Sequence, residues 1–187
     1  AYKLYQSWRD ESRAARIQAN RGALLIESGR AAEGLLDVKN ALSVVERLGD
    51  TNFQTYCLRI LATYYRNQGR HADALRELNK ALAIAKERNL ADNVTVMTTF
   101  VALSQFETGD YRDAIESLRS ALKDGSGRLS SEARIRLART YIRMGSLTLA
   151  ATELERAESE LRTSPNEGLQ VLFLLVRGEW ELESGQP

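Results

Sequence analysis

The sequence predicts an all-α protein, an α-solenoid built from antiparallel helix pairs, and three observations support this. The 187 residues include 27 Leu and 23 Ala but only 2 Pro, and Leu and Ala are among the strongest helix formers. Glycines recur at a nearly constant spacing, and very small residues recur at fixed distances from these glycines. No segment has the roughly 18 consecutive apolar residues that a membrane-spanning helix needs, so we expect no membrane partner.

The glycines define a repeat. Gly29, Gly69, Gly109, Gly145 and Gly185 are separated by 40, 40, 36 and 40 residues. A glycine suits the end of a helix, because the left-handed backbone found there is costly for a residue with a Cβ atom. Each repeat is therefore predicted to be a helix, a glycine-centred turn and a second helix.

The residues around each glycine predict how the two helices pack. These residues fall into four sets, and within each set the members share a side-chain size and a distance from the glycine. Seven residues before it stand Gly22, Ala62, Ala102, Ala138 and Gly178; five after it Gly34, Ala74, Ala114 and Ala150; nine after it Val38, Leu78, Leu118 and Leu154; and twelve after it Ala41, Ala81, Ala121 and Ala157. Spacings of four and three place residues on one face of a helix. Small side chains on that face allow two helices to approach closely, while the large residue inserts into the core.

The individual helices follow from these turns and from start signals between repeats. Asp50 precedes Thr51, Ser130 or Ser131 precedes the helix that contains Arg134, and Ser164 and Pro165 are followed by Glu167 in a capping-box arrangement. The predicted helices cover residues 1–10, 13–28, 31–48, 52–68, 71–88, 93–108, 111–123, 131–144, 147–162 and 166–184.

This pattern resembles the tetratricopeptide-repeat (TPR) family. The family motif stands in the second repeat as Leu61, Ala62, Tyr65, Gly69, Ala74, Leu78 and Ala81. The resemblance implies a right-handed superhelix of helix pairs. The 40-residue spacing exceeds the family's usual 34 and is similar to the longer repeats of bacterial regulator sensor regions and kinesin light chains. HEAT repeats are an alternative of similar length, but they do not require alanine at these three spacings.

We predict a single solenoid domain over residues 1–187, with repeats at 13–50, 51–90, 91–130 and 131–165 and partial repeats at 1–12 and 166–187. Tyr5 and Trp8 have the spacing of a second helix's face, and the last partial repeat has only a first helix. We therefore expect a fragment of a longer chain. Its last helix would leave Leu172, Leu174, Leu175 and Val176 uncovered, which suggests self-association through the open C-terminal repeat.

The resemblance also implies a partner-binding groove lined by the first helix of each repeat. The groove positions carried over from the family are Arg16, Tyr56, Arg59, Thr63, Arg66, Asn67, Thr99, Leu103, Phe106, Arg139, Ile142 and Arg143. Arginines on either side of Leu103 and Phe106 suit a peptide that offers carboxylates around an apolar anchor. The alternative is that these arginines lie on a solvated face and pair with nearby glutamates.

The function predicted is a protein-interaction scaffold whose groove binds a peptide of a partner or of the parent chain. The alternative is a sensor or regulatory region of a bacterial signalling protein that binds a small effector. No catalytic residues, metal site or cofactor are expected, since His71 suits an aromatic turn position and Cys57 a core thiol. The net charge of +1 argues against a nucleic acid partner, and one cysteine suits the cytoplasm.

Overall fold

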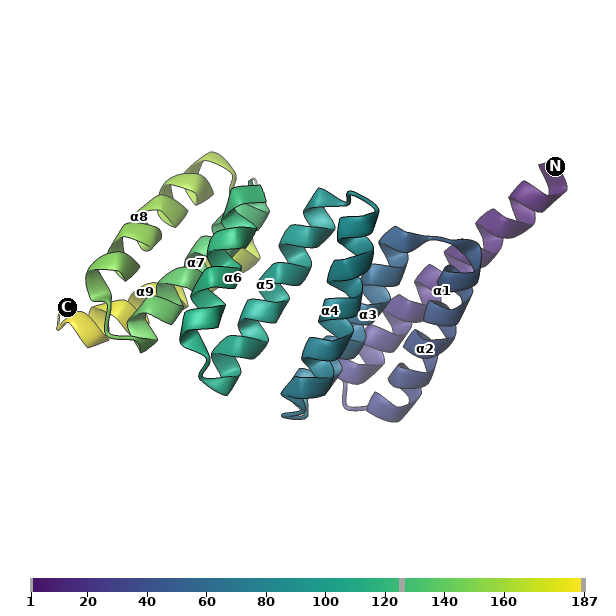
Figure 1. Cartoon of the computed structure of the whole chain (residues 1–187), viewed down its shortest axis with the longest axis horizontal. Coiled ribbons are helices and arrows are strands. Elements are labelled where there is room, and N and C mark those ends of the chain that lie inside the picture. Colours follow the sequence, from purple (N-terminus) through teal and green to yellow (C-terminus); the bar gives the residue numbers. More distant parts are fainter. Residues whose placement is uncertain (1, 125–126, 186–187) are drawn as a thin grey trace. The chain divides into compact units, whose positions relative to one another are not determined.

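The computed structural model describes the backbone of residues 2–124 and 127–185 and the side chains of residues 10–123 and 127–185. Over this part of the chain it contains nine α-helices and no β-strand (Figure 1). The helices are α1 (Tyr2–Glu27), α2 (Ala31–Leu48), α3 (Thr51–Asn67), α4 (His71–Glu87), α5 (Ala91–Thr108), α6 (Tyr111–Asp124), α7 (Arg128–Arg143), α8 (Leu147–Thr163) and α9 (Glu167–Ser184). The predicted all-α class and the helix pairs are confirmed.

The chain forms two compact units, Ala1–Asn93 and Val94–Pro187, so that the boundary falls within α5. In the first unit, α1 pairs with α2 and α3 with α4, and α2 also packs against α3. In the second unit α7 pairs with α8, α6 packs against α7, and α9 packs against both α7 and α8. Each unit has a core cluster of its own.

The beginning of the chain differs from the prediction. Helices were expected at 1–10 and 13–28, but a single helix, α1, runs from Tyr2 to Glu27. No glycine or proline stands between residues 10 and 13 to interrupt it, and the Ser12 hydroxyl donates to Asp50 Oδ2 at 3.1 Å instead of capping a new helix. The predicted face of Tyr5 and Trp8 lies outside the side chains that the structure describes.

The predicted turns are present. Gly69 and Gly145 both have φ of 70°, a backbone conformation that glycine adopts without strain. Their amides donate to Arg66 O and Ile142 O at 2.9 Å, which satisfies carbonyls at the ends of α3 and α7.

The small residues lie where the helices cross. Ala62, Ala74, Ala138 and Ala150 are all buried. The closest approach is in the first pair, where a Cβ atom added to Gly22 of α1 would lie 2.7 Å from Gly34 O of α2. A methyl group would already crowd this crossing. The small side chains at these positions therefore determine how closely the two helices approach.

The last helix covers more of its apolar surface than expected. Val176 was predicted to be uncovered but is fully buried, and Leu172 is half-buried. Both packing partners, α7 and α8, lie on the same side of α9, and Val176 and Leu172 face that side. Leu174 and Leu175 on the opposite side remain exposed. Within the described residues, no helix is both long and apolar enough to cross a membrane.

Candidate partner-binding groove

The second unit has an apolar groove between first helices of successive repeats. Leu103 and Phe106 come from α5, Arg136 and Arg139 from α7, and Leu172 from α9. The full lining is Ala102, Leu103, Phe106, Leu118, Arg136, Arg139, Thr140, Leu172 and Val176. The cavity at its floor is about 20 Å³, whereas pockets for small molecules commonly enclose about 300 to 1,000 Å³. A cavity of this size holds about one water molecule, so the groove is shallow and is not a small-molecule pocket.

Arg139 is the central charged residue of this groove. Its Nε and one terminal nitrogen donate to the two carboxylate oxygens of Glu179 on α9, at 2.9 and 2.6 Å. Its guanidinium carbon lies 5.7 Å from the centre of the Phe106 ring. Such a two-point pair fixes the orientation of the guanidinium group, so Arg139 is held in place beside the apolar floor.

The neighbouring arginines differ in whether a carboxylate of the chain pairs with them. Arg136 donates to Glu132 of the same helix at 2.7 and 3.1 Å. Arg143, one turn beyond Arg139 at the end of α7, is exposed and makes no ion pair within the described residues. Arg143 is therefore the groove arginine whose charge is most available to a partner.

Two predicted groove residues point into the protein instead. Thr99 is buried, and its hydroxyl donates to Thr95 O at 2.9 Å. Ile142 is buried in the core of the second unit. The structure thus brings Leu103, Phe106 and Arg139 together in one groove. Arg143 lies outside its lining, one turn further along α7, and Thr99 and Ile142 are buried.

The remaining predicted residues lie in the first unit. Arg16 of α1 pairs with Asp50 at 2.8 Å and stacks over Phe53, 5.0 Å from the ring centre. Tyr56 of α3 donates to Asn20 Oδ1 at 2.8 Å. Arg59 lies over the Tyr56 ring at 5.0 Å. These contacts form a polar and aromatic face along α1 and α3.

The other three residues follow along α3. Thr63 and Arg66 are half-buried, and Asn67 is exposed at the end of the helix. The Thr63 hydroxyl is enclosed and has no hydrogen-bond partner in the described part of the chain.

Asp50 anchors this face of the first unit. Burial opposes ionisation of Asp50, but hydrogen bonds from Arg16, the Phe53 amide and Ser12 outweigh it and hold its pKa below the usual value. The Phe53 amide donates to Asp50 Oδ1 at 3.2 Å, and this hydrogen bond also caps the start of α3. One carboxylate therefore fixes the beginning of α3 and the position of Arg16.

The predicted set of partner-binding residues did not include those that α9 contributes, although Glu179 was expected to interrupt a basic groove. Leu172 and Glu179 lie thirteen and six residues before Gly185, the same distances at which Tyr56 and Thr63 precede Gly69. The signal was therefore present, since the spacing used for the other repeats also applies to the last one. The consequence is that Arg139 already has a carboxylate partner supplied by the chain itself.

In the part of the chain that the structure describes, we find neither a metal centre nor a reactive thiol. No group of three or more potential metal ligands occurs among the described residues. Burial raises the pKa of the Cys57 thiol to about 12, and nearby Asp50 and Glu46 add to this. A thiol protonated at neutral pH is a poor nucleophile.

Family models for the tetratricopeptide repeat match residues 13–87, 58–124 and 102–166. These matches cover most of the chain without a gap. A comparison with curated protein sequences found no match.

Solved structures show a similar fold at low sequence identity. The apo form of RapI has a TM-score of 0.77 at 15% identity over 91% of this chain and 49% of its own. A signal-transduction ATPase with a TPR sensor from Pyrococcus horikoshii has a TM-score of 0.70 at 17% identity, over 90% of this chain and 26% of its own. A Podospora anserina putative kinesin light chain repeat protein has a TM-score of 0.69 at 14% identity, over 94% of this chain and 88% of its own.

The chain spans about half the length of RapI and about a quarter of the archaeal ATPase. These likenesses concern the fold alone. The family assignment comes from the repeat models together with the glycine turns and small-residue crossings described above. The chain belongs to the tetratricopeptide-repeat family.

Proposed function

We propose that this chain is a protein-interaction scaffold and that the groove of the second unit binds a peptide segment of a protein partner. The supporting observation is the juxtaposition of Arg139 with Phe106 and Leu103. A guanidinium group held over an aromatic ring at the rim of an apolar floor matches a ligand with an apolar side chain next to a carboxylate.

The charges of the groove indicate which kind of peptide it would bind. Arg136 and Arg139 are already paired with Glu132 and Glu179, so a strongly acidic ligand would find few available cations. Arg143 is exposed and offers one. The ligand that fits best has one apolar anchor, seated over Phe106, and one or two carboxylates directed at Arg143 and the edge of Arg139.

A fluorescence anisotropy titration tests this proposal. The probe is a labelled peptide with one Phe flanked by Asp residues, and its partner probe has Lys in place of Asp. We expect the acidic probe to bind and Arg143→Glu to weaken it about tenfold, because the variant replaces an attraction by a repulsion. Arg112→Glu, an exposed site on α6, is the matched control. Equal binding of the two probes, or no effect of Arg143→Glu, would remove the proposed site.

A sensor function is the second candidate. An open cavity of about 380 Å³ in the first unit, lined by Arg21, Leu25, Arg30, Glu33, Leu36 and Asp37, has the volume of a small-molecule site. The archaeal structure with a similar fold carries a TPR sensor. A thermal-shift screen with metabolites tests this candidate, because a ligand that binds the folded state raises its melting temperature.

A further inference from the structure

The Phe106 ring on the floor of the groove contacts two other side chains of the second unit. The guanidinium carbon of Arg139 lies over it, 5.7 Å from the ring centre. The ring of Tyr111, the first residue of α6, has its centre 5.5 Å from that of Phe106, and the two planes are inclined by 57°. Cations within about 6 Å of a ring centre and tilted rings about 4.5 to 7 Å apart attract each other. Phe106 is therefore held by a cation and by a second ring.

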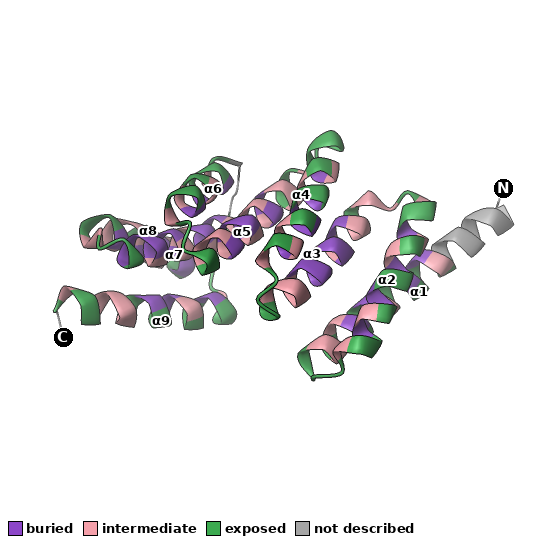
Figure 2. Cartoon of the chain, turned by 60° about the horizontal axis from the view of Figure 1, so that its bottom comes forward, coloured by how far each residue is buried: buried purple, intermediate pink, exposed green. Residues whose placement is uncertain are grey.

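These contacts continue into α9 through Arg139, which binds Glu179 with two hydrogen bonds. One series of contacts thus joins four helices of the second unit, through Tyr111 of α6, Phe106 of α5, Arg139 of α7 and Glu179 of α9. Figure 2 shows α7 with mostly buried and intermediate residues, and α6 and α9 with exposed residues along their outer sides. The middle of the series is therefore the better enclosed part.

Tyr111 acts on the groove only through Phe106. It is absent from the groove lining, to which α6 contributes Leu118. Its side chain is half-buried, and its hydroxyl makes no hydrogen bond within the described residues. The contact with Phe106 is made by the ring alone. A ligand on the floor would touch Phe106 and not Tyr111.

The backbone fixes the place of Tyr111 beside Phe106. The two residues are five apart, and the turn between them is closed by hydrogen bonds from the Gly109 amide to Phe106 O at 3.1 Å and from the Tyr111 amide to Gly109 O at 2.8 Å. Helices α5 and α6 are also joined by the Ser117 hydroxyl, which donates to Gln105 Oε1 at 2.9 Å. A short hydrogen-bonded turn therefore brings the second ring to the groove.

The other complete repeats do without this pair of rings. Counted from the turn glycines, the position of Phe106 is occupied in them by Ile26, Arg66 and Ile142, and that of Tyr111 by Ala31, His71 and Leu147. None of the three has aromatic side chains at both positions. The pair is thus dispensable for the helix–turn–helix unit, and its occurrence in the repeat that forms the groove floor points to a role in binding.

The physical role follows from the freedom of a phenylalanine ring. The terminal torsion of Phe is broad, so a half-buried ring without neighbours can turn. A ring that becomes fixed only when a ligand arrives costs conformational entropy, whereas a ring fixed beforehand does not. The contact with Tyr111 limits the orientations of Phe106 and keeps its face toward Arg139.

We propose that Tyr111 is a positioning residue that determines which anchor the groove selects. By fixing Phe106 against Arg139, it offers a ligand a flat apolar surface of constant orientation, which favours a large apolar anchor over a small one. This inference rests on the proposed binding of a peptide in the groove.

A measurement without any ligand tests the positioning. The Nε–H proton of Arg139 is held by Glu179 and lies near the Phe106 ring, whose ring current shifts its NMR signal. Arg139→Lys identifies that signal by its loss, and Phe106→Leu gives its position without the ring. We expect Tyr111→Leu to move the signal toward the Phe106→Leu position and Tyr111→Phe to leave it in place. Leucine suits the fold, because Leu147 occupies this position in the next repeat.

A comparison of two labelled peptides tests the selection. The first is the acidic Phe probe, and the second has Ala in place of Phe. In the unaltered chain the ratio of their dissociation constants measures the preference for a large anchor. Tyr111→Leu should reduce this preference about fivefold, which is about 1 kcal/mol and within the range of aromatic pairs. A smaller folded fraction would weaken both probes by the same factor and leave the ratio unchanged.

Two variants serve as controls for this ratio. Tyr111→Phe keeps the ring and removes a hydroxyl that has no hydrogen bond within the described residues, so it should preserve the preference. His71→Leu makes a matched change at the same position of the second repeat and should preserve it as well.

The results separate this inference from the function on which it rests. An Arg139 signal that Tyr111→Leu leaves in place would overturn the positioning role, whether or not a peptide binds. A ratio that Tyr111→Leu leaves unchanged would overturn the selection. If the acidic Phe probe does not bind the unaltered chain, the proposed function falls and the selection with it, while the Arg139 signal still decides whether Tyr111 positions Phe106.

Discussion

Gly22 of α1 and Gly34 of α2 meet at the crossing of the first helix pair with no room for a methyl group between them. A Cβ atom at Gly22 would lie 2.7 Å from Gly34 O and 2.7 Å from Val38 Cγ2. Both atoms belong to the packed core of the pair, since Val38 is fully buried. The backbone of the two helices would have to separate to accept a larger residue.

We therefore predict that Gly22→Ala lowers the free energy of unfolding by about 1 to 3 kcal/mol, the usual cost of overpacking. Gly178→Ala is the control, because the same change in open space should leave the free energy of unfolding unchanged or raise it by at most about 1 kcal/mol, through the higher helix propensity of alanine. Urea denaturation of both variants measures the difference. Equal stabilities of the two variants would contradict the close crossing.

The alanine crossings predict a second effect of side-chain size. Ala74 and Ala114 are fully buried at the corresponding positions of the next two repeats. Ala74→Leu or Ala114→Leu should cost about 1 to 3 kcal/mol by forcing the helices apart. Ala72→Leu, at an exposed position of α4, should change the melting temperature little. An unaltered melting temperature for Ala74→Leu would contradict the repeat alignment.

Much of this architecture could be predicted from the sequence because it depends on local chemistry. A glycine such as Gly69 ends a helix wherever it stands, and an alanine such as Ala74 permits close packing in every repeat. The continuity of α1 was not predicted, because a sequence that permits a helix boundary near residue 12 does not require one. The serine there is used in a bond to Asp50.

The groove could be predicted only in part, because its charges depend on contacts between repeats. Arg139 and Glu179 lie 40 residues apart, which is one repeat, and occupy the same position in neighbouring first helices. The repeat spacing could have paired them, but only side-chain geometry shows that they meet. Thr99 and Ile142 illustrate the opposite error, since family positions that suit a groove are buried here.

The acid stability of the first unit should depend on Asp37 and Asp50. The hydrogen bond from Arg21 holds the pKa of Asp37 below its usual value, and the pKa of Asp50 is lowered as well. A carboxyl group with a lower pKa in the folded state stabilises the fold above its unfolded pKa, about 3.9. This stabilisation is lost as the pH falls through the folded value.

We predict that stability decreases as the pH falls below about 4 and that Asp50→Asn makes this decrease less steep while lowering stability at pH 7. Asp10→Asn, at an exposed residue of α1, serves as the control. Thermal denaturation followed by circular dichroism between pH 2 and 7 measures both effects. If Asp50→Asn left the pH dependence unchanged, the bonds from Arg16 and Phe53 to Asp50 would not stabilise the fold.

The ion pair of Arg139 and Glu179 leads to a prediction about the affinity of the groove for the acidic peptide. A peptide carboxylate that approaches Arg139 must compete with Glu179, which is bound by two hydrogen bonds at 2.9 and 2.6 Å. Glu179→Gln keeps the size of the side chain and removes its charge. The acidic Phe peptide should then bind up to about fivefold more tightly, since about 1 kcal/mol corresponds to roughly fivefold in affinity. Anisotropy titration measures this change.

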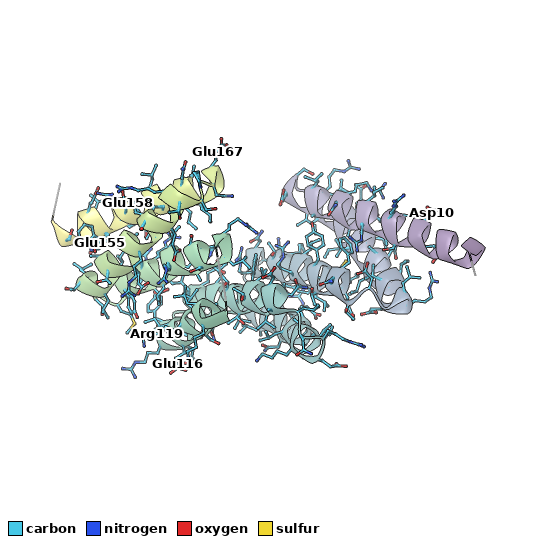
Figure 3. The ribbon with its side chains drawn as sticks, turned by 90° about the horizontal axis from the view of Figure 1, so that it is seen from above. Asp10, Glu116, Arg119, Glu155, Glu158 and Glu167 are labelled. Atoms are coloured by element: carbon cyan, nitrogen blue, oxygen red, sulfur yellow. The ribbon has the colours of Figure 1, made fainter. Side chains whose placement is uncertain are left out.

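Glu116→Gln, an exposed site on α6 that Figure 3 shows at the opposite edge of the second unit from Glu167, controls for the loss of one negative charge. The melting temperature should fall only slightly in Glu179→Gln, because a partly exposed ion pair contributes about 1 kcal/mol or less. Unchanged affinity with an unchanged fold would mean that the ligand does not reach Arg139. Weaker affinity would mean that Glu179 itself receives a cation from the ligand, which would reverse the charge assigned to the partner.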